Sequence, residues 1–103
     1  MAAAGHVPHA AQVTKTTSPA WILKLIAAQD PHSRTVVEED RYRGRRVFVI
    51  MPADRAPDSG NENVLHAEDG RVICEFGGIA GRVVRGSCSI DEIRFSRTLF
   101  PKQ

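Results

Sequence analysis

The sequence predicts an α+β fold in which one N-terminal helix packs on an antiparallel meander of about four strands. Two observations lead to this prediction. One early segment repeats apolar residues at helical spacing, and the later apolar segments are short and separated by glycine-containing turns. The length of 103 residues suits one domain and leaves no room for two. We therefore expect a disordered tail over residues 1–17 and a single small domain over residues 18–103.

The helix is expected over residues 19–29. Ser18 is a good N-cap, and Pro19 is favourable at the first helical position. The dipeptide Asp30-Pro31 ends the helix, because proline disfavours helical backbone at the residue before it. The apolar residues that share one face are Trp21, Ile22, Leu25 and Ile26. This face either joins the core or binds a partner, and we favour the core.

Two β-hairpins are expected next. Their four strand segments are residues 36–42, 46–51, 64–67 and 72–76. The first pair turns at Arg43-Gly44, where glycine adopts a positive φ without strain. The second pair turns over residues 68–70, which end in glycine. These segments make up the expected meander.

The chain after residue 76 is less regular. Glycine at positions 77, 78, 81 and 86 indicates a backbone that turns tightly or passes close to another segment. Over residues 89–100 two patterns compete. Ser89 and Glu92 fit a capping box for a short helix, whereas Ile93 and Phe95 fit the alternation of a strand. We favour a strand or an extended segment here.

Charge and hydropathy exclude some classes of protein. No apolar stretch approaches the ~20 residues of a membrane-spanning helix, and the net charge of +2 does not indicate nucleic acid. Arginines at positions 41, 43, 45 and 46 surround Tyr42 and would suit phosphate contacts with base stacking. The acidic residues Glu38, Glu39 and Asp40 neutralise much of this charge. We expect these acidic residues on a solvated, charge-rich face.

Several motifs occur in an order that resembles a known family. They are Tyr42 to Phe48 (YRGRRVF), Asp69 to Cys74 (DGRVIC), Gly77 to Gly81 (GGIAG) and a final Cys88. In this order they resemble a family of small bacterial secreted or lipoprotein domains of uncharacterised function. The resemblance implies a periplasmic or secreted protein, and it implies no activity and no catalytic residues. A cytoplasmic location is the alternative, because no secretory signal is visible in the sequence.

The cysteines depart from the pattern of that family. Its members usually carry an adjacent cysteine pair after the second strand, available to the two later cysteines. This chain reads Met51-Pro52-Ala53-Asp54 in that region. If the family's cysteines bond in that way, Cys74 and Cys88 lack those partners. They either bond each other or stay free, and we favour the bond.

No group of residues matches a catalytic or cofactor pattern. Residues 77–81 lack the Gly-Lys-Ser/Thr ending of a phosphate-binding loop. His66 and Cys74 could face each other across the second hairpin, but two groups form neither a triad nor a zinc site. We therefore expect no catalytic residue, no metal and no cofactor.

The segment over residues 52–63 offers the most usable surface. It is stiffened by two prolines and presents Asp54, Arg55 and Asp58, and long loops in small domains often carry function. The expected function is a non-catalytic extracytoplasmic domain that binds another protein. The alternatives are a hydrolase inhibitor that presents residues 52–63, and a small Cys/His metal or thiol enzyme.

Overall fold

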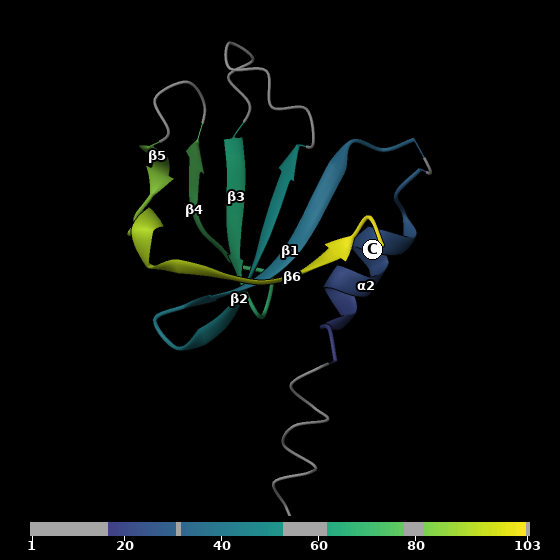
Figure 1. Ribbon diagram of the computed structural model, residues 1–103, viewed down its shortest axis with the longest axis horizontal. Coiled ribbons are helices and arrows are strands. Elements are labelled where there is room, and N and C mark those ends of the chain that lie inside the picture. Colours follow the sequence, from purple (N-terminus) through teal and green to yellow (C-terminus); the bar gives the residue numbers. More distant parts are fainter. Residues whose placement is uncertain (1–16, 31, 53–61, 78–81, 103) are drawn as a thin grey trace, which may run out of the picture.

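A computed structural model describes residues 17–30, 32–52, 62–77 and 82–102. Within these ranges the elements are α2 (Ala20–Ala27), β1 (Thr35–Tyr42), β2 (Arg45–Pro52), β3 (Glu62–Ala67), β4 (Val72–Gly77), β5 (Arg82–Gly86), the 3-10 helix η2 (Ile90–Glu92) and β6 (Ile93–Phe100). The described part of the molecule is mostly an antiparallel sheet with one short α-helix, in agreement with the expected α+β class (Figure 1). The sheet has six strands rather than about four, in the order β5-β4-β3-β2-β1-β6.

Both expected hairpins are present, and their turns lie where the glycines indicated. In the first hairpin Val37 pairs with Ile50, and Arg43 and Gly44 form the turn with φ of 51° and 79°. In the second hairpin Leu65 pairs with Cys74, and Gly70 has a φ of 96°. Local alternation and turn residues therefore determine this part of the sheet.

The extra strands come from the irregular last third of the chain. β5 lies inside the glycine-rich stretch and pairs with β4. Gly86 has a φ of 71°, and a Cβ atom placed there would lie 2.3 Å from the carbonyl oxygen of Ile73. This glycine allows the edge strand to approach β4. After the η2 turn, the expected strand is present as β6, which pairs with β1.

The connection from β5 to β6 shows that the sheet is curled. These strands follow one another in the chain but lie at opposite ends of the strand order. A flat sheet of six strands is about 24 Å wide between its edge strands. The link over residues 87–92 is too short to span that width, because half of it is the 3-10 turn. The edges therefore approach each other, and Figure 1 shows β6 running across the sheet from below β5 toward α2.

The curl separates two apolar clusters. The inner cluster has Val47, Val49, Met51, Leu65 and Cys74 as its buried members, and it also contacts Cys88 of the link. The outer cluster has Ile22, Val37 and Phe48 as its buried members, with Trp21, Leu25 and Ile26 packed against them. The apolar face of α2 thus belongs to the core, as expected. The helix is shorter than expected, and Pro19 rather than Ser18 is its N-cap.

Candidate functional site

Part of the surface singled out in the sequence lies outside the described residues. The structure does not describe Asp54, Arg55 and Asp58. The binding loop over residues 52–63 and the inhibitor alternative therefore remain predictions. Residues 1–16 of the expected tail also lie outside. Thr17 is described, and its carbonyl oxygen accepts a hydrogen bond of 2.8 Å from Arg46 Nη1.

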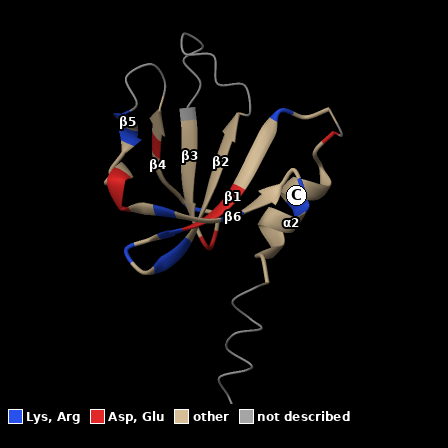
Figure 2. Ribbon diagram, in the orientation of Figure 1, with Lys and Arg blue, Asp and Glu red and all other residues tan. Residues whose placement is uncertain are grey.

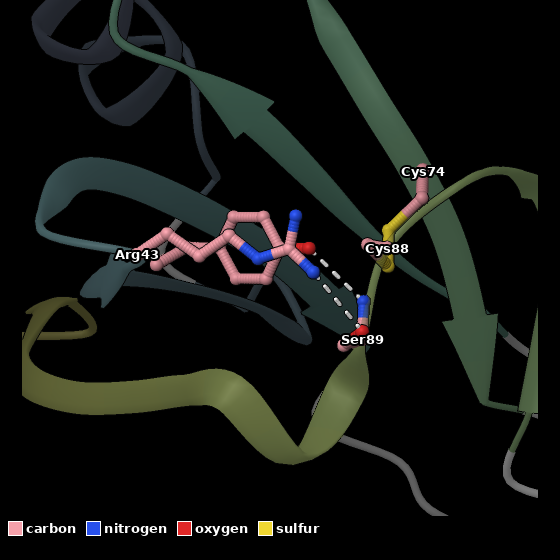
Figure 3. The surroundings of a disulfide bond; sticks show 5 residues. Arg43, Cys74, Cys88 and Ser89 are labelled. Carbon is pink, nitrogen blue, oxygen red and sulfur yellow. Dashed lines mark hydrogen bonds between the residues drawn. A yellow bond between two sulfur atoms is a disulfide. The ribbon is translucent and has the colours of Figure 1, made fainter.

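The two cysteines form a disulfide, with an S–S distance of 2.06 Å (Figure 3). Cys74 is fully buried in the inner cluster, so the bond ties β4 to the link between β5 and β6. Beside it, the Ser89 backbone N–H donates to the Tyr42 hydroxyl oxygen at 3.0 Å. Arg43 donates to Glu92 at 3.0 Å, which fastens the same link to the first hairpin.

The structure does not bring His66 and Cys74 together. Leu65 is the residue opposite Cys74, and a register shift places His66 opposite Val72. The His66 ring lies 5.0 Å from the Trp21 ring, and its Nδ1 atom lies 3.0 Å from the Gly70 carbonyl oxygen. The two side chains belong to opposite faces of the sheet. The Cys/His pair of the enzyme alternative is therefore absent, and no cluster of three metal-ligating residues occurs in the described part of the chain.

A pocket of about 690 Å³ lies between the ends of the two hairpins. It is lined by residues from the 41–47 segment on one side and from the 67–73 segment on the other, and we call it the hairpin pocket. Because β2 and β3 are paired only from Val47 and Ala67 onward, the two turns project beyond their last shared pair. The pocket is therefore built from segments that are distant in sequence.

The hairpin pocket is rich in arginine. Its lining includes Arg41, Arg45, Arg46 and Arg71. Figure 2 shows basic residues concentrated around the turn between β1 and β2. Among the described residues, the guanidinium groups of Arg41, Arg45 and Arg71 have no hydrogen bond and no ion pair. These three groups are available to an external ligand.

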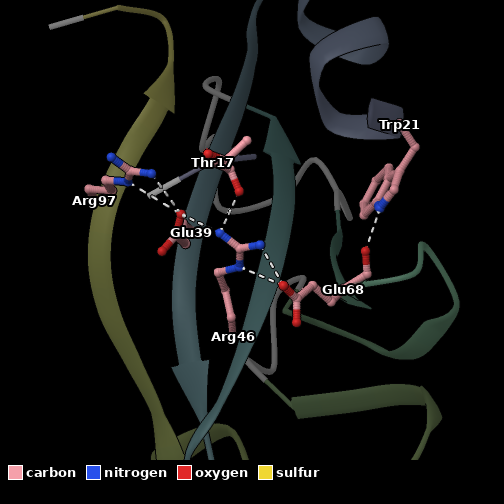
Figure 4. A network of polar contacts seen from close by, with 6 residues as sticks. All are labelled: Thr17, Trp21, Glu39, Arg46, Glu68 and Arg97. Atoms are coloured by element: carbon pink, nitrogen blue, oxygen red, sulfur yellow. Dashed lines mark hydrogen bonds and ion pairs between the residues drawn. The ribbon is translucent and has the colours of Figure 1, made fainter. Parts of the chain in front are cut away.

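Arg46 is the exception, because it belongs to a network on the outer face of the sheet (Figure 4). Its guanidinium donates to Glu68 Oε2, at 3.0 Å from Nε, and lies 3.9 Å from Glu39. Arg97 Nη2 donates to the same Glu39 carboxylate at 3.0 Å. The Trp21 indole N–H donates to the Glu68 carbonyl oxygen at 2.8 Å. The network joins the start of α2 to the sheet.

The prediction of a solvated acidic face is wrong for two of its three residues. Glu39 is 4% exposed and Asp40 is 3% exposed. Both lie on β1, which has β2 on one side and β6 on the other. Glu39 is on the outer face with Arg46 and Arg97. Asp40 lies an even number of residues from Val36 and Tyr42, which pack against the inner cluster, so it shares their inner face of β1.

Asp40 is a buried carboxyl group with an altered pKa. Burial, followed by the nearby charge of Glu38, raises its pKa from 3.8 to about 7, and a hydrogen bond from the Ser96 backbone N–H opposes this shift. Its Oδ1 atom has no hydrogen-bond partner among the described residues. The group does not line the hairpin pocket, so it bears on stability rather than on binding.

Sequence reasoning identified only part of the hairpin pocket. Arg41 and Arg45 belong to the cluster noted in the sequence, and the acidic segment reaches Arg46 of that cluster, through Glu39, but neither Arg41 nor Arg45 in the described residues. Arg71 was missed, because it comes from the second hairpin and is isolated in sequence. The signal that could have found it is its position just after the Gly70 turn.

Comparison with protein families, with curated proteins and with solved structures finds no match for this chain. The family resemblance carried by the motifs therefore stays a prediction. Within the described ranges, no helix has both the length and the apolar character needed to cross a membrane.

Proposed function

We propose that the chain is a non-catalytic domain that binds another protein outside the cytoplasm. The observation that supports this most directly is the hairpin pocket, about 690 Å³ in volume and lined by three arginines without an intramolecular partner in the described residues. Arginine is favoured where proteins recognise one another, because its planar fork forms paired hydrogen bonds. A pocket with unused recognition groups and no nucleophile beside a base favours binding over catalysis.

The proposed compartment is supported by the disulfide. Disulfides persist in oxidising compartments and are rare in the cytosol of mesophiles. The bond between Cys74 and Cys88 joins two parts of the sheet, and one of its cysteines is fully buried. A periplasmic or secreted setting is consistent with such a structural disulfide.

Affinity capture tests this proposal. The immobilised, oxidised domain is incubated separately with periplasmic or secreted protein and with cytoplasmic protein from its source organism, and bound proteins are identified by mass spectrometry. We expect one stoichiometric partner from the extracytoplasmic fraction. A partner found only in the cytoplasmic fraction would refute the proposed location, and the absence of a partner from both would refute protein binding.

A further inference from the structure

We infer that the hairpin pocket binds acidic side chains, Asp or Glu, presented by a segment of the partner protein. This inference rests on the proposed function and adds the chemistry of the partner. Three features of the pocket lead to it: its unpaired arginines, its acidic rim and its apolar floor.

The arginines give the pocket an excess of positive charge. The Arg46 guanidinium donates hydrogen bonds to the Glu68 carboxylate and to the Thr17 carbonyl oxygen. The charges of Arg46 and Glu68 therefore largely compensate each other. Of the remaining charged residues that line the pocket, three are positive (Arg41, Arg45 and Arg71) and one, Asp69, is negative. A guanidinium group and a carboxylate form two parallel charge-assisted hydrogen bonds. The pocket is therefore suited to one or two carboxylates.

The same surroundings disfavour an extended polyanion such as a nucleic acid. Asp69 lies at the turn of the second hairpin and would repel a continuous phosphate backbone. Among the residues that line the pocket, the aromatic ring is that of Tyr42, and the guanidinium of Arg43 already covers it at 5.0 Å from the ring centroid. Phe48 is fully buried, and Trp21 packs against it with a centroid distance of 5.8 Å.

The floor of the pocket favours a peptide over a free small anion. Ala67 and Ile73, which are half-buried, contribute apolar surface to the pocket beside the arginines. An apolar side chain next to the acidic residue would cover this surface, which adds a hydrophobic contribution of roughly 25 cal/mol per Å². Inorganic phosphate would contact the arginines alone.

The test is a titration of the full chain with defined peptides, followed through the backbone amide signals in NMR spectra. The first probe is a blocked peptide in which glutamates flank a leucine. The second probe has glutamine in place of each glutamate. We expect the glutamate peptide to shift the amide signals of residues 41–46 and 67–71, and the glutamine peptide to bind at least about tenfold more weakly.

Matched variants locate the interaction. Arg45 and Arg71 are exposed, so the double substitution Arg45→Gln/Arg71→Gln leaves the core intact and should weaken binding of the glutamate peptide by about tenfold or more. The control Arg34→Gln/Arg82→Gln removes the same charge from exposed positions outside the pocket and should bind like the unmodified chain. Equal weakening by both variants would overturn the inference, since it would indicate general charge attraction.

Other probes distinguish the remaining outcomes. Inorganic phosphate or a single-stranded oligonucleotide that shifts the same signals at lower concentration than the glutamate peptide would overturn the assignment to a carboxylate. If the chain captures a protein partner and the Arg45→Gln/Arg71→Gln variant captures it equally well, this inference fails while the proposed function stands. Absence of both capture and peptide binding overturns both.

Discussion

Asp40 is a carboxyl group whose surroundings oppose its own ionisation. It lies on the inner face of β1, 3% exposed, with an Oδ1 atom that has no hydrogen-bond partner in the described part of the chain. Burial and the charge of Glu38 raise its pKa to about 7. The folded molecule therefore holds a proton that the unfolded chain, with a pKa of about 3.8 at this position, releases.

This difference predicts how stability depends on pH. Between about pH 4 and pH 7 the folded state binds more protons at Asp40 than the unfolded state, so the free energy of unfolding falls as the pH rises through this window. Asp40→Asn keeps the shape without the charge, and at pH 8 it should raise the free energy of unfolding by about 1–3 kcal/mol. Urea unfolding across this pH range measures both effects.

The exposed Asp91→Asn substitution is the control, because it changes the net charge equally without touching the inner cluster. Its pH profile should run parallel to that of the unmodified chain. A parallel profile for Asp40→Asn as well would contradict the assignment of the pH dependence to Asp40.

At the scale of elements, α2 is held by polar contacts as well as by its apolar face. Arg46 reaches from β2 to Glu39 on β1, to Glu68 on the turn after β3 and to Thr17 before α2. Its side chain is 10% exposed and its guanidinium lies 5.4 Å from the centroid of the Phe48 ring. Four segments of the chain therefore depend on one side chain.

Arg46→Met should lower the free energy of unfolding by about 3 kcal/mol, because it keeps most of the volume but leaves the buried Glu39 with fewer partners. Chemical denaturation measures the loss. Arg43→Met is the matched control, because Arg43 forms an exposed ion pair with Glu92 and its loss should cost much less. Equal losses for the two variants would show that the Arg46 network adds no more than a surface ion pair.

The elements also show what sequence patterns can and cannot predict. The helix and both hairpins were predictable, because periodicity and turn residues act over a few neighbouring residues. β5 was missed because its glycine-rich surroundings indicate turns, while its pairing depends on the contact between Gly86 and the Ile73 backbone. The burial of Glu39 and Asp40 was missed because it depends on β6, which is more than 50 residues further along the chain.

In the candidate site, too, local patterns were predictable from the sequence and contacts between distant segments were not. Arg41 and Arg45 were noted because they cluster in sequence, whereas Arg71 joins them only when the two hairpin ends meet. A local pattern thus predicted part of the hairpin pocket, and the pairing of β2 with β3 was needed to complete it.

At the scale of the whole molecule, the curl brings the edge strands close, and the disulfide fixes the link that joins them. Cys74 and Cys88 are separated by 14 positions, and closing a loop of this size stabilises a fold by about 3 kcal/mol. Cys74→Ser/Cys88→Ser should therefore lower the free energy of unfolding by about this amount. Urea unfolding with and without a reductant measures it, and reductant should leave the double variant unchanged. An unmodified chain that is insensitive to full reduction would contradict this role.

The pairing of β6 with β1 also has a consequence for synthesis. Of the strands described, β1 leaves the ribosome first and β6 leaves it last, yet they are neighbours. The hairpins can form as they emerge, but one side of β1 stays bare until residues 93–100 are free. During that interval the inner apolar cluster is open to water on one side, a condition that exposes a nascent chain to aggregation. The interval ends only when the last strand is added.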